Sequence, residues 1–556
     1  MVEWEKRGAA SWRMGPRGMC SSGGDPALAP FASCCSKSAV ENRAAGMALA
    51  DDVQDDVPEE LDLHGVLEEV PRIRGPPMLR HLVLMMGHLG THFAWAVQNA
   101  RASLFLQRLG LSSSVTALVL MAGPLSGLLV QPIVGVLSDH CTSRLGRRRP
   151  YLLVGCAVCM VSLSCMSAGS TISRTHGGKP NALATLLGVL SIVGTDVSLN
   201  VLSAAHRALV TDILPAHEQS IGNAWGSRLG GLGSVLGYLF GETDLPAQLP
   251  TLSGAFQLDQ LALLALLAAG LLLLTHASLF LLVHESRLVS GDVHGVRRLM
   301  RVPWELLATA SVLPRAILDL FAIQFAAWLA WFPVLFFSVS WVANIYRAAH
   351  GDPGGSSATS DRAGDEARRV GSYAMFGYAC TSLVSSVVLP WLVQDGTHDG
   401  RSAHKPRRVR CFDTPYLRWL RAPTLAEAWC ASHVLFGTAL LFGTCPTYST
   451  HSVAGAILLL SVLGVSWTLT NWAPFTLLSL MLYTTHEPGT AAEDQVPLAP
   501  LHQTPTSTQH TAHGTDLLPH TGAVLGLHNW SIVVPQMVVS LVSSAGVYPA
   551  RRSRAA

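Results

Sequence analysis

The stretch AGPLSGLLVQPIVGVLSDHCTSRLGRRRPY runs from Ala122 to Tyr151 and decides the fold. Its first part is apolar and ends at Ser138, and its second part carries Arg144, Arg147, Arg148 and Arg149. Short loops on the cytoplasmic side of membrane proteins are enriched in Arg and Lys. An apolar run followed by such a loop therefore predicts a membrane protein that crosses the bilayer repeatedly.

Composition supports this class for the whole chain. Of 556 residues, 49% are hydrophobic and 13% are charged, whereas soluble proteins carry roughly 25% charged residues. The net charge of +2 does not indicate a nucleic-acid partner. We find no nucleophile–base set, metal cluster or phosphate-binding loop, so we expect no enzyme, no metal and no cofactor other than a coupling proton.

A helix needs about 20 mostly apolar residues to cross a bilayer, and helices pair all their backbone groups within lipid. The sequence therefore predicts an all-α membrane protein with the lipid bilayer as its surroundings. We expect eleven spans, at residues 80–103, 115–138, 150–170, 182–210, 219–241, 259–283, 316–342, 370–394, 426–446, 453–482 and 520–546.

The spans predict an organisation in two halves. Six spans, a basic central loop and five further spans indicate a two-part carrier without its last helix. With a cytoplasmic amino terminus, the basic loops fall on one side, but the basic tail falls on the other, which we interpret as a truncation or an altered reading of the gene. The predicted parts are a disordered cytoplasmic segment 1–78, a six-helix bundle 79–283, a central cytoplasmic loop 284–315, a five-span bundle 316–546 with long loops 395–425 and 484–519, and a basic tail 547–556.

Ionisable residues within spans mark functional sites by default. The fourth span holds Asp196, Asn200 and Arg207 on one helical stripe. Asp196 and Arg207 are about 16 Å apart along the axis at 1.5 Å per residue, which is too far for a direct pair. A buried carboxylate can exchange protons as its surroundings change. We favour a proton-coupling role for this group over a static ion pair between helices.

Two further ionisable residues lie in the same half. His206 points about 100° away from the stripe, and we favour a packing or end position for it. Arg228 in the fifth span is a second cation within the membrane and the expected cross-helix partner of an acid.

Sugar sites combine amide or carboxylate groups with aromatic surfaces. A single Trp is more often an interface or packing residue, but polar and aromatic residues recur together in the first, seventh and tenth spans. This combination indicates a central cavity for a polyol. The candidate substrate-binding residues are Trp95, Gln98, Asn200, Arg228, Gln324, Trp328, Trp331 and Asn471.

Several motifs carry a family resemblance. The segment SDHCTSRLGRRRPY resembles the RxGRRRPY signature of sucrose transporters, a branch of the glycoside–pentoside–hexuronide cation symporters in the major facilitator superfamily. The stretches FAWAVQ, QFAAWLAWFP and VSWTLTNWAPF resemble the first, seventh and tenth spans of that family. The stretch AHEQSIGNAWGSRLGGLG is similar to the fungal α-glucoside permease side of the family.

The resemblance implies a major facilitator fold, with two pseudo-symmetric helical bundles around a midplane site and alternating access. It also implies that Asp196 accepts the proton and that Arg207 is its partner in the substrate pathway. Without the family, the loop arginines would be topology determinants only. The residues implied to form a cytoplasmic gate are Asp139, Arg144, Gly146, Arg147, Arg148 and Arg149.

These observations predict symport of a proton with a sucrose-like or maltose-like glycoside, with the plasma membrane as the default location. An internal membrane such as the vacuolar one stays open. The alternatives are a facilitator or exporter without proton coupling, a sugar sensor that does not transport, and a truncated product that does neither.

Overall fold

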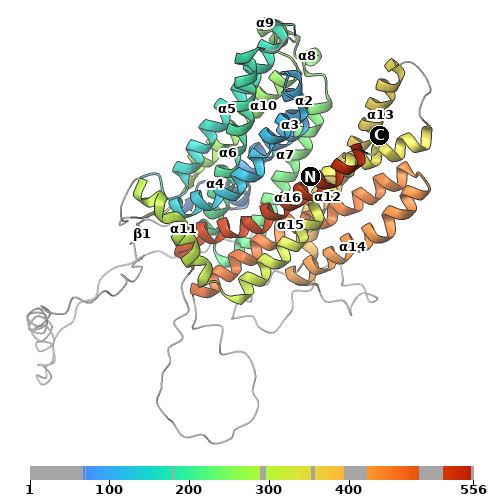
Figure 1. The fold of residues 1–556 in the computed structure, drawn as a ribbon. Coiled ribbons are helices and arrows are strands. Elements are labelled where there is room, and N and C mark those ends of the chain that lie inside the picture. Colours follow the sequence, from blue (N-terminus) through green and yellow to red (C-terminus); the bar gives the residue numbers. More distant parts are fainter. Residues whose placement is uncertain are drawn as a thin grey trace, which may run out of the picture. The chain divides into compact units, whose positions relative to one another are not determined.

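The computed structural model describes residues 67–68, 71–177, 181–288, 296–351, 357–393, 422–486 and 517–552, which are almost entirely helical (Figure 1). The helices are α2 Arg80–Arg108, α3 Ser113–Leu120, α4 Ala122–Asp139, α5 Arg149–Thr175, α6 Ala182–Ile213, α7 Gln219–Glu242, α8 Leu245–Gln248, α9 Pro250–Phe256, α10 Gln260–Leu282, α11 Val296–Ser311, α12 Arg315–His350, α13 Ser357–Leu392, α14 Leu425–Ser449, α15 Val453–His486 and α16 Thr521–Arg552. Short 3-10 turns lie at Pro77–Leu79, Ala216–Glu218 and Leu518–His520.

The eleven predicted spans all fall on helices, with α3 and α4 together forming the second. Within the described residues, nine helical segments are long and apolar enough to cross a membrane. The two long helices outside this set are α2 and α7, which carry more polar and charged residues. These two helices pack on each other, and polar side chains such as Thr91 and Gln98 of α2 are buried.

The helices form two groups. Helices α2, α4, α5, α6, α7 and α10 pack on one another, and α12 to α16 form a second group. Each group has its own hydrophobic core. The groups meet where α16 packs on α4 and where α13 and α15 pack on α7. The prediction of an all-α fold with about eleven spans is confirmed.

Several helices begin at residues that cap them. Asn181 accepts hydrogen bonds from the first N–H groups of α6, and Asp259 does so at α10. Thr424 and Glu427 form a reciprocal capping box at the start of α14. These side chains satisfy backbone donors that have no partner within the helix, so the helix starts are set by local sequence.

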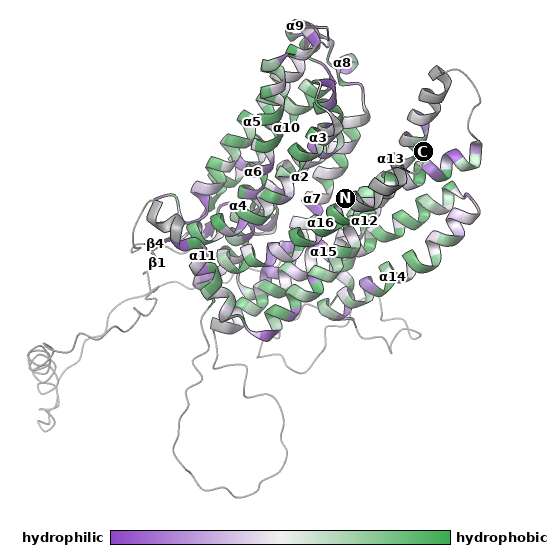
Figure 2. Cartoon of the chain, viewed as in Figure 1, coloured by the Kyte–Doolittle hydropathy of each residue, from purple (hydrophilic) through white to green (hydrophobic). Residues whose placement is uncertain are grey.

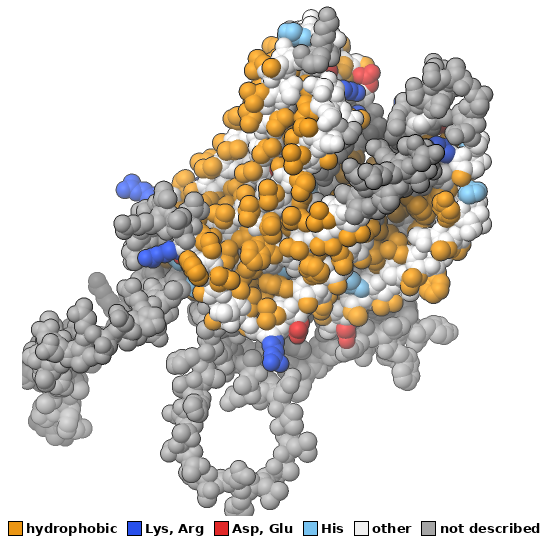
Figure 3. Space-filling view, in the orientation of Figure 1, with side chains coloured by type: hydrophobic (Ala, Val, Ile, Leu, Met, Phe, Trp, Pro, Cys, Tyr) orange, Lys and Arg blue, Asp and Glu red, His pale blue; other side chains and the backbone are white. Residues whose placement is uncertain are grey.

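The outer surface of the described helices is apolar. Figure 3 shows hydrophobic side chains spread over the face in view, and Figure 2 shows that hydrophobic residues recur along the helices. Large apolar side chains such as Leu274, Leu441 and Phe442 are 68%, 72% and 75% exposed. Soluble monomers rarely expose contiguous apolar surface on this scale, so these side chains face lipid.

Two predicted irregular segments contain regular structure. Strand β1, Leu67–Glu68, pairs antiparallel with β4, Arg287–Leu288, and β2, Arg72–Ile73, pairs with β3, Val283–His284. Strands β1 and β2 precede α2, and β3 and β4 follow α10. The strands meet because these two helices lie side by side. The predicted central loop 284–315 also contains α11, and the tail predicted from residue 547 continues α16 to Arg552. Residues 1–66 and 69–70 of segment 1–78, and most of loops 395–425 and 484–519, lie outside the described residues.

Candidate functional site

A set of side-chain hydrogen bonds links α2, α4 and α6 around Asp196. Gln98 donates to the Asp196 carboxylate at 2.7 Å, and Gln131 donates to the amide oxygen of Asn200 at 2.6 Å. The Asn200 amide donates to Ser126 at 2.8 Å. All five side chains are buried. Among the described residues no cation forms an ion pair with Asp196.

Arg207 lies further along α6 and also lacks an opposite charge. Its guanidinium lies 4.2 Å from the centroid of the Phe475 ring of α15, a cation–π contact between the two helix groups. The Nη1 atom is buried without a hydrogen-bond partner. No ion pair joins Arg207 to Asp196 or to another described carboxylate, which agrees with the distance expected from their spacing.

Arg228 does not have the acidic partner that was expected for it. Its Nε donates to the backbone carbonyl of Ser386 in α13 at 2.9 Å, and its guanidinium lies over the Trp225 ring at 4.8 Å. No described carboxylate forms an ion pair with it. The expectation of an acidic partner was wrong because the facing helix supplies a backbone carbonyl as acceptor, which a sequence pattern does not reveal.

The predicted aromatic residues of the second half form one cluster. The Trp331 ring centroid lies 5.0 Å from that of Trp467 and 4.4 Å from that of Phe436. Trp328 contacts Trp467 at 5.5 Å. Trp331 is 2% exposed, and its indole donates to Thr470. Trp331 is therefore a core residue of the α12–α16 group, in line with the packing alternative for a single Trp.

The remaining predicted residues differ in how well their polar atoms are satisfied. Gln324 is fully buried, and neither side-chain polar atom has a hydrogen-bond partner. The Trp328 indole nitrogen is also buried without a partner. Asn471 donates to the Trp467 carbonyl within its own helix at 2.9 Å, and Trp95 is half-buried on α2. Buried unsatisfied groups are uncommon, so Gln324 and Trp328 are the better ligand-binding candidates among the predicted residues of this half.

Sequence reasoning missed two residues of α16 that belong to this region. His528 is fully buried between the rings of Phe321 and Phe475, and neither ring nitrogen has a partner. Asn529 donates to the Gly127 carbonyl of α4 at 2.7 Å. A polar pair inside an apolar run is a detectable signal, but its partners lie on other helices, 402 positions away in the case of Asn529 and Gly127.

The arginine-bearing loop after α4 meets the start of α16. Both carboxylate oxygens of Asp139 accept backbone N–H groups, from Gly522 and from Ala523, each at 2.9 Å. These are first-turn donors of α16 that have no partner within the helix. The negative charge also lies at the positive end of the helix dipole. Asp139 thus joins the two helix groups directly.

Arg148 forms an ion pair with Asp139. This pair measures 2.5 Å, a second pair joins Arg148 to Asp212 of α6 at 2.9 Å, and the Arg148 side chain is fully buried. Arg147 also pairs with Asp212, at 3.0 Å. Burial alone would lower the pKa of Arg148, but the charges of Asp212 and then Asp139 raise it above its ordinary value. The arginine therefore stays charged.

Glu285, after α10, completes the cluster. Its two carboxylate oxygens accept the backbone N–H of Arg148 at 2.9 and 2.8 Å. Burial, and secondly the charge of Asp212, raise the pKa of Glu285 to about 7. Asp212 and Glu285 are not among the predicted gate residues, because their contacts with Arg148 span 64 and 137 positions of sequence.

The other predicted gate residues have different surroundings. Gly146 adopts a φ of +107°, and a Cβ added there would lie 2.5 Å from a carboxylate oxygen of Glu285. Both the backbone conformation and the space therefore require glycine. Arg149 donates to the Phe280 carbonyl at 2.6 Å. Arg144 is exposed and makes no ion pair with a described residue, so it fits the topology-determinant alternative.

A second set of contacts closes the same end of the molecule. The Tyr483 hydroxyl of α15 hydrogen-bonds the carbonyls of Thr211 and Leu214 at 2.8 and 2.7 Å. Ser479 lies 3.1 Å from the Thr211 hydroxyl. Together with Asp139, these residues hold α15 and α16 against α4 and α6. We call this set (Asp139, Arg148, Thr211, Ser479 and Tyr483) the arginine-side latch.

The chain is similar to several known transport proteins. Residues 84–292 match the family described as MFS/sugar transport protein. The chain is 28% identical over 458 residues to the general alpha-glucoside permease of Schizosaccharomyces pombe, an alignment covering 72% of this chain and 79% of that protein. It is 32% identical over 325 residues to sucrose transport protein SUT5 of Oryza sativa subsp. indica, covering 54% of this chain and 59% of that protein. For sucrose transport protein SUT3 of subsp. japonica the identity is 30% over 284 residues, covering 48% and 56%. The chain thus spans less than two thirds of the two rice proteins.

Two helical groups that meet through buried charges, within an apolar outer surface, are typical of a multi-pass membrane protein. The motif resemblance is confirmed by the family match and the relatives: residues 84–292 match the MFS/sugar transport family, and the chain is similar to an alpha-glucoside permease and to sucrose transport proteins. These relatives are transport proteins, which agrees with the prediction that the chain is not an enzyme.

Proposed function

We propose that the protein carries an α-glucoside, such as sucrose or maltose, together with a proton across a membrane by alternating access. The observation that carries this proposal is Asp196, a buried carboxylate with an amide donor and no ion-pair partner among the described residues. Desolvation favours the neutral form of such a group, while water or a nearby cation favours its charged form. Opening and closing of the cavity would therefore load and release the proton.

Arg207 and the second half supply groups that suit a sugar. Arg207 offers an unused guanidinium N–H, and Gln324 offers an unused amide in α12. Trp328 adds an aromatic surface with a free indole N–H. Sugar sites combine such donors and acceptors with apolar ring faces. The relatives, which are an alpha-glucoside permease and sucrose transport proteins, support the same substrate class.

The arginine-side latch supplies the conformational step. It holds one side closed through contacts between the two helix groups. In alternating access these contacts break when the bundles 79–283 and 316–546 rock against each other around the site. We place the latch on the cytoplasmic side, as the loop arginines indicate, and we propose the plasma membrane as the location.

Uptake measurements in transport-deficient cells test the proposal. Radiolabelled sucrose and maltose are offered at external pH 5 and pH 7.5, with and without an uncoupler. We expect accumulation that is favoured by acid and abolished by the uncoupler. Asp196→Asn should reduce the internal-to-external sugar ratio to about one while exchange persists. Asp319→Asn, which changes an exposed carboxylate of α12, is the matched control and should accumulate normally.

The alternatives give different results in the same assay. Uptake that ignores pH and survives Asp196→Asn would identify an uncoupled facilitator. Absence of uptake despite confirmed surface expression would reject transport of these sugars and favour a sensor.

A further inference from the structure

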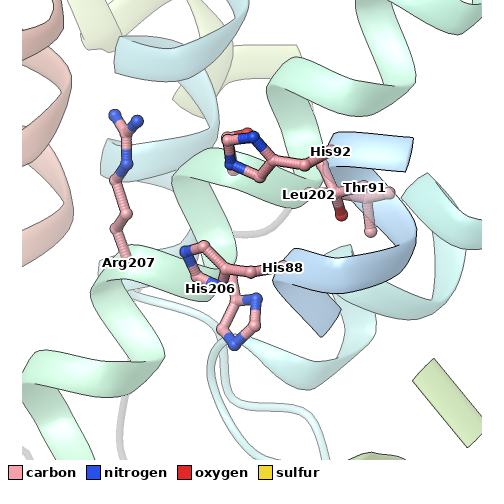
Figure 4. A pocket seen from close by; sticks show the side chains of 7 residues that line it. His88, Thr91, His92, Leu202, His206 and Arg207 are labelled. Carbon is pink, nitrogen blue, oxygen red and sulfur yellow. The ribbon is translucent and has the colours of Figure 1, made fainter. Parts of the chain in front are cut away.

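A small pocket lies between α2 and α6, beside the proposed proton site but separate from it. Figure 4 shows its imidazole rings gathered together, with the Arg207 guanidinium alongside. The proposed function uses Arg207 but none of the histidines. The pocket is lined by His88, Thr91 and His92 of α2 and by Leu202, Ser203, His206 and Arg207 of α6.

The rings leave hydrogen-bond acceptors unused. His206 hydrogen-bonds the Leu84 carbonyl through Nε2 at 2.7 Å. Because a carbonyl only accepts, Nε2 carries the proton and Nδ1 holds a lone pair. The centroid of the His88 ring lies 4.4 Å from that of the His206 ring, and Nδ1 of His88 is buried without a hydrogen-bond partner. Behind them, His276 of α10 bonds the Leu272 carbonyl and leaves a buried, unpartnered Nε2.

Glycines make room for these rings. A Cβ added at Gly87 would lie 2.8 Å from a ring carbon of His206 and 3.4 Å from Nε2 of His276. A Cβ added at Gly230 of α7 would lie 3.0 Å from the His92 ring. The close approach of the His206 and His92 rings to the helix backbones therefore depends on glycine at these positions of α2 and α7. The imidazoles are held on packed helices, so the pocket is preformed.

The charges around the pocket restrict what can enter it. Arg207 of α6 provides an unused N–H, and its charge repels a cation. Other titratable residues around the pocket are His88 and His92 of α2 and His276 of α10. No described carboxylate forms an ion pair with Arg207 or with any of these histidines. An anion would satisfy Arg207 but would face the lone pairs of the rings. A group that both donates and accepts satisfies both sides.

A hydroxyl is such a group. We propose that this pocket is a subsite for one hydroxyl of the sugar, which accepts from Arg207 and donates to the His92 ring, a ring that makes no hydrogen bond with another described residue. His88 and His206 hold the His92 side of the pocket. The position suits a substrate bound between the halves, because Arg207 also touches Phe475 of α15. This inference rests on the proposed function.

Deoxy sugars test the subsite. Purified protein is titrated with methyl α-D-glucoside and its four monodeoxy derivatives, and binding is followed by tryptophan fluorescence. In the wild type we expect one derivative to bind about tenfold more weakly than the parent, the loss of one hydrogen bond. In His92→Leu the parent should itself bind about tenfold more weakly, and the preference over that derivative should disappear.

Two further variants make the result decisive. Gly230→Ala displaces the His92 ring without removing it and should reduce the same preference, which keeps the test available if His92→Leu does not fold. His433→Leu, in α14 and outside the pocket, should keep the full tenfold preference. A preference that persists in both pocket variants overturns the subsite alone. A wild type that binds none of the glucosides overturns the proposed function, and the subsite with it.

Discussion

Arg148 is the residue on which the arginine-side latch depends most. Its fully buried guanidinium bonds Asp139, Asp212 and Ser138. Removing one partner of a buried ion pair leaves the other charge uncompensated, at a cost of about 3–5 kcal/mol. The motif GRRRPY therefore has a structural reason in this chain: Gly146 makes room for Glu285, and Arg148 organises the surrounding acids.

Glu285 makes the stability of this cluster depend on pH. Its pKa in the folded protein is raised to about 7 from an ordinary 4.5, and the charged groups that face it are Arg147, Arg148 and Asp212. A carboxyl with a raised pKa contributes its full stability below its ordinary pKa and loses that contribution as pH rises through the raised value. We therefore expect the Tm of the purified protein to fall between pH 5 and pH 8.

Glu285→Gln isolates this contribution, because glutamine imitates the protonated carboxyl at every pH. The decrease in Tm between pH 5 and pH 8 should be smaller in the variant than in the wild type, with similar values at pH 5. Equal decreases in the two proteins would show that Glu285 does not titrate in this range.

At the scale of elements, α16 is the helix whose placement closes the arginine side. It begins at Thr521, so the N–H groups of Gly522 and Ala523 need acceptors from outside the helix. Asp139, at the last turn of α4, supplies them. The Asp139 carboxylate thus lies at the end of α4, caps the start of α16 and binds Arg148. These contacts couple the position of α16 to the loop before α5.

Asp139→Asn should open this side. The amide loses the charge that pairs with Arg148 and one of two acceptor oxygens. We expect a cysteine placed at Ser479, which is 2% exposed, to react with maleimide roughly tenfold faster or more in this background, consistent with losing a buried ion pair. The rate is measured on purified protein and corrected for the chain without the Ser479→Cys change.

Arg144→Gln is the control for loop charge, because Arg144 is exposed in the same loop. Its labelling rate should equal that of the parent. Unchanged labelling in Asp139→Asn, or equal acceleration by both variants, would mean that the latch does not hold the closed state.

At the scale of the whole molecule, the sequence predicted what depends on local pattern. Hydropathy over about 20 residues is a local property, so helices could be located at all eleven predicted positions, and nine described segments are apolar enough to cross a membrane. The stripe of Asp196, Asn200 and Arg207 is also local, because it lies on one helix. Asp212, Glu285 and His528 could not be found in this way, since their roles arise from partners on distant helices. The acidic partner expected for Arg228 was wrong for the same reason.

The most direct test of the account is proton movement driven by sugar. Purified protein is placed in proteoliposomes that contain a pH-sensitive dye, and maltose or sucrose is added outside without any pH gradient. The account predicts acidification of the interior with the wild type and none with Asp196→Asn. Sugar entry into the vesicles without any change of internal pH would contradict it.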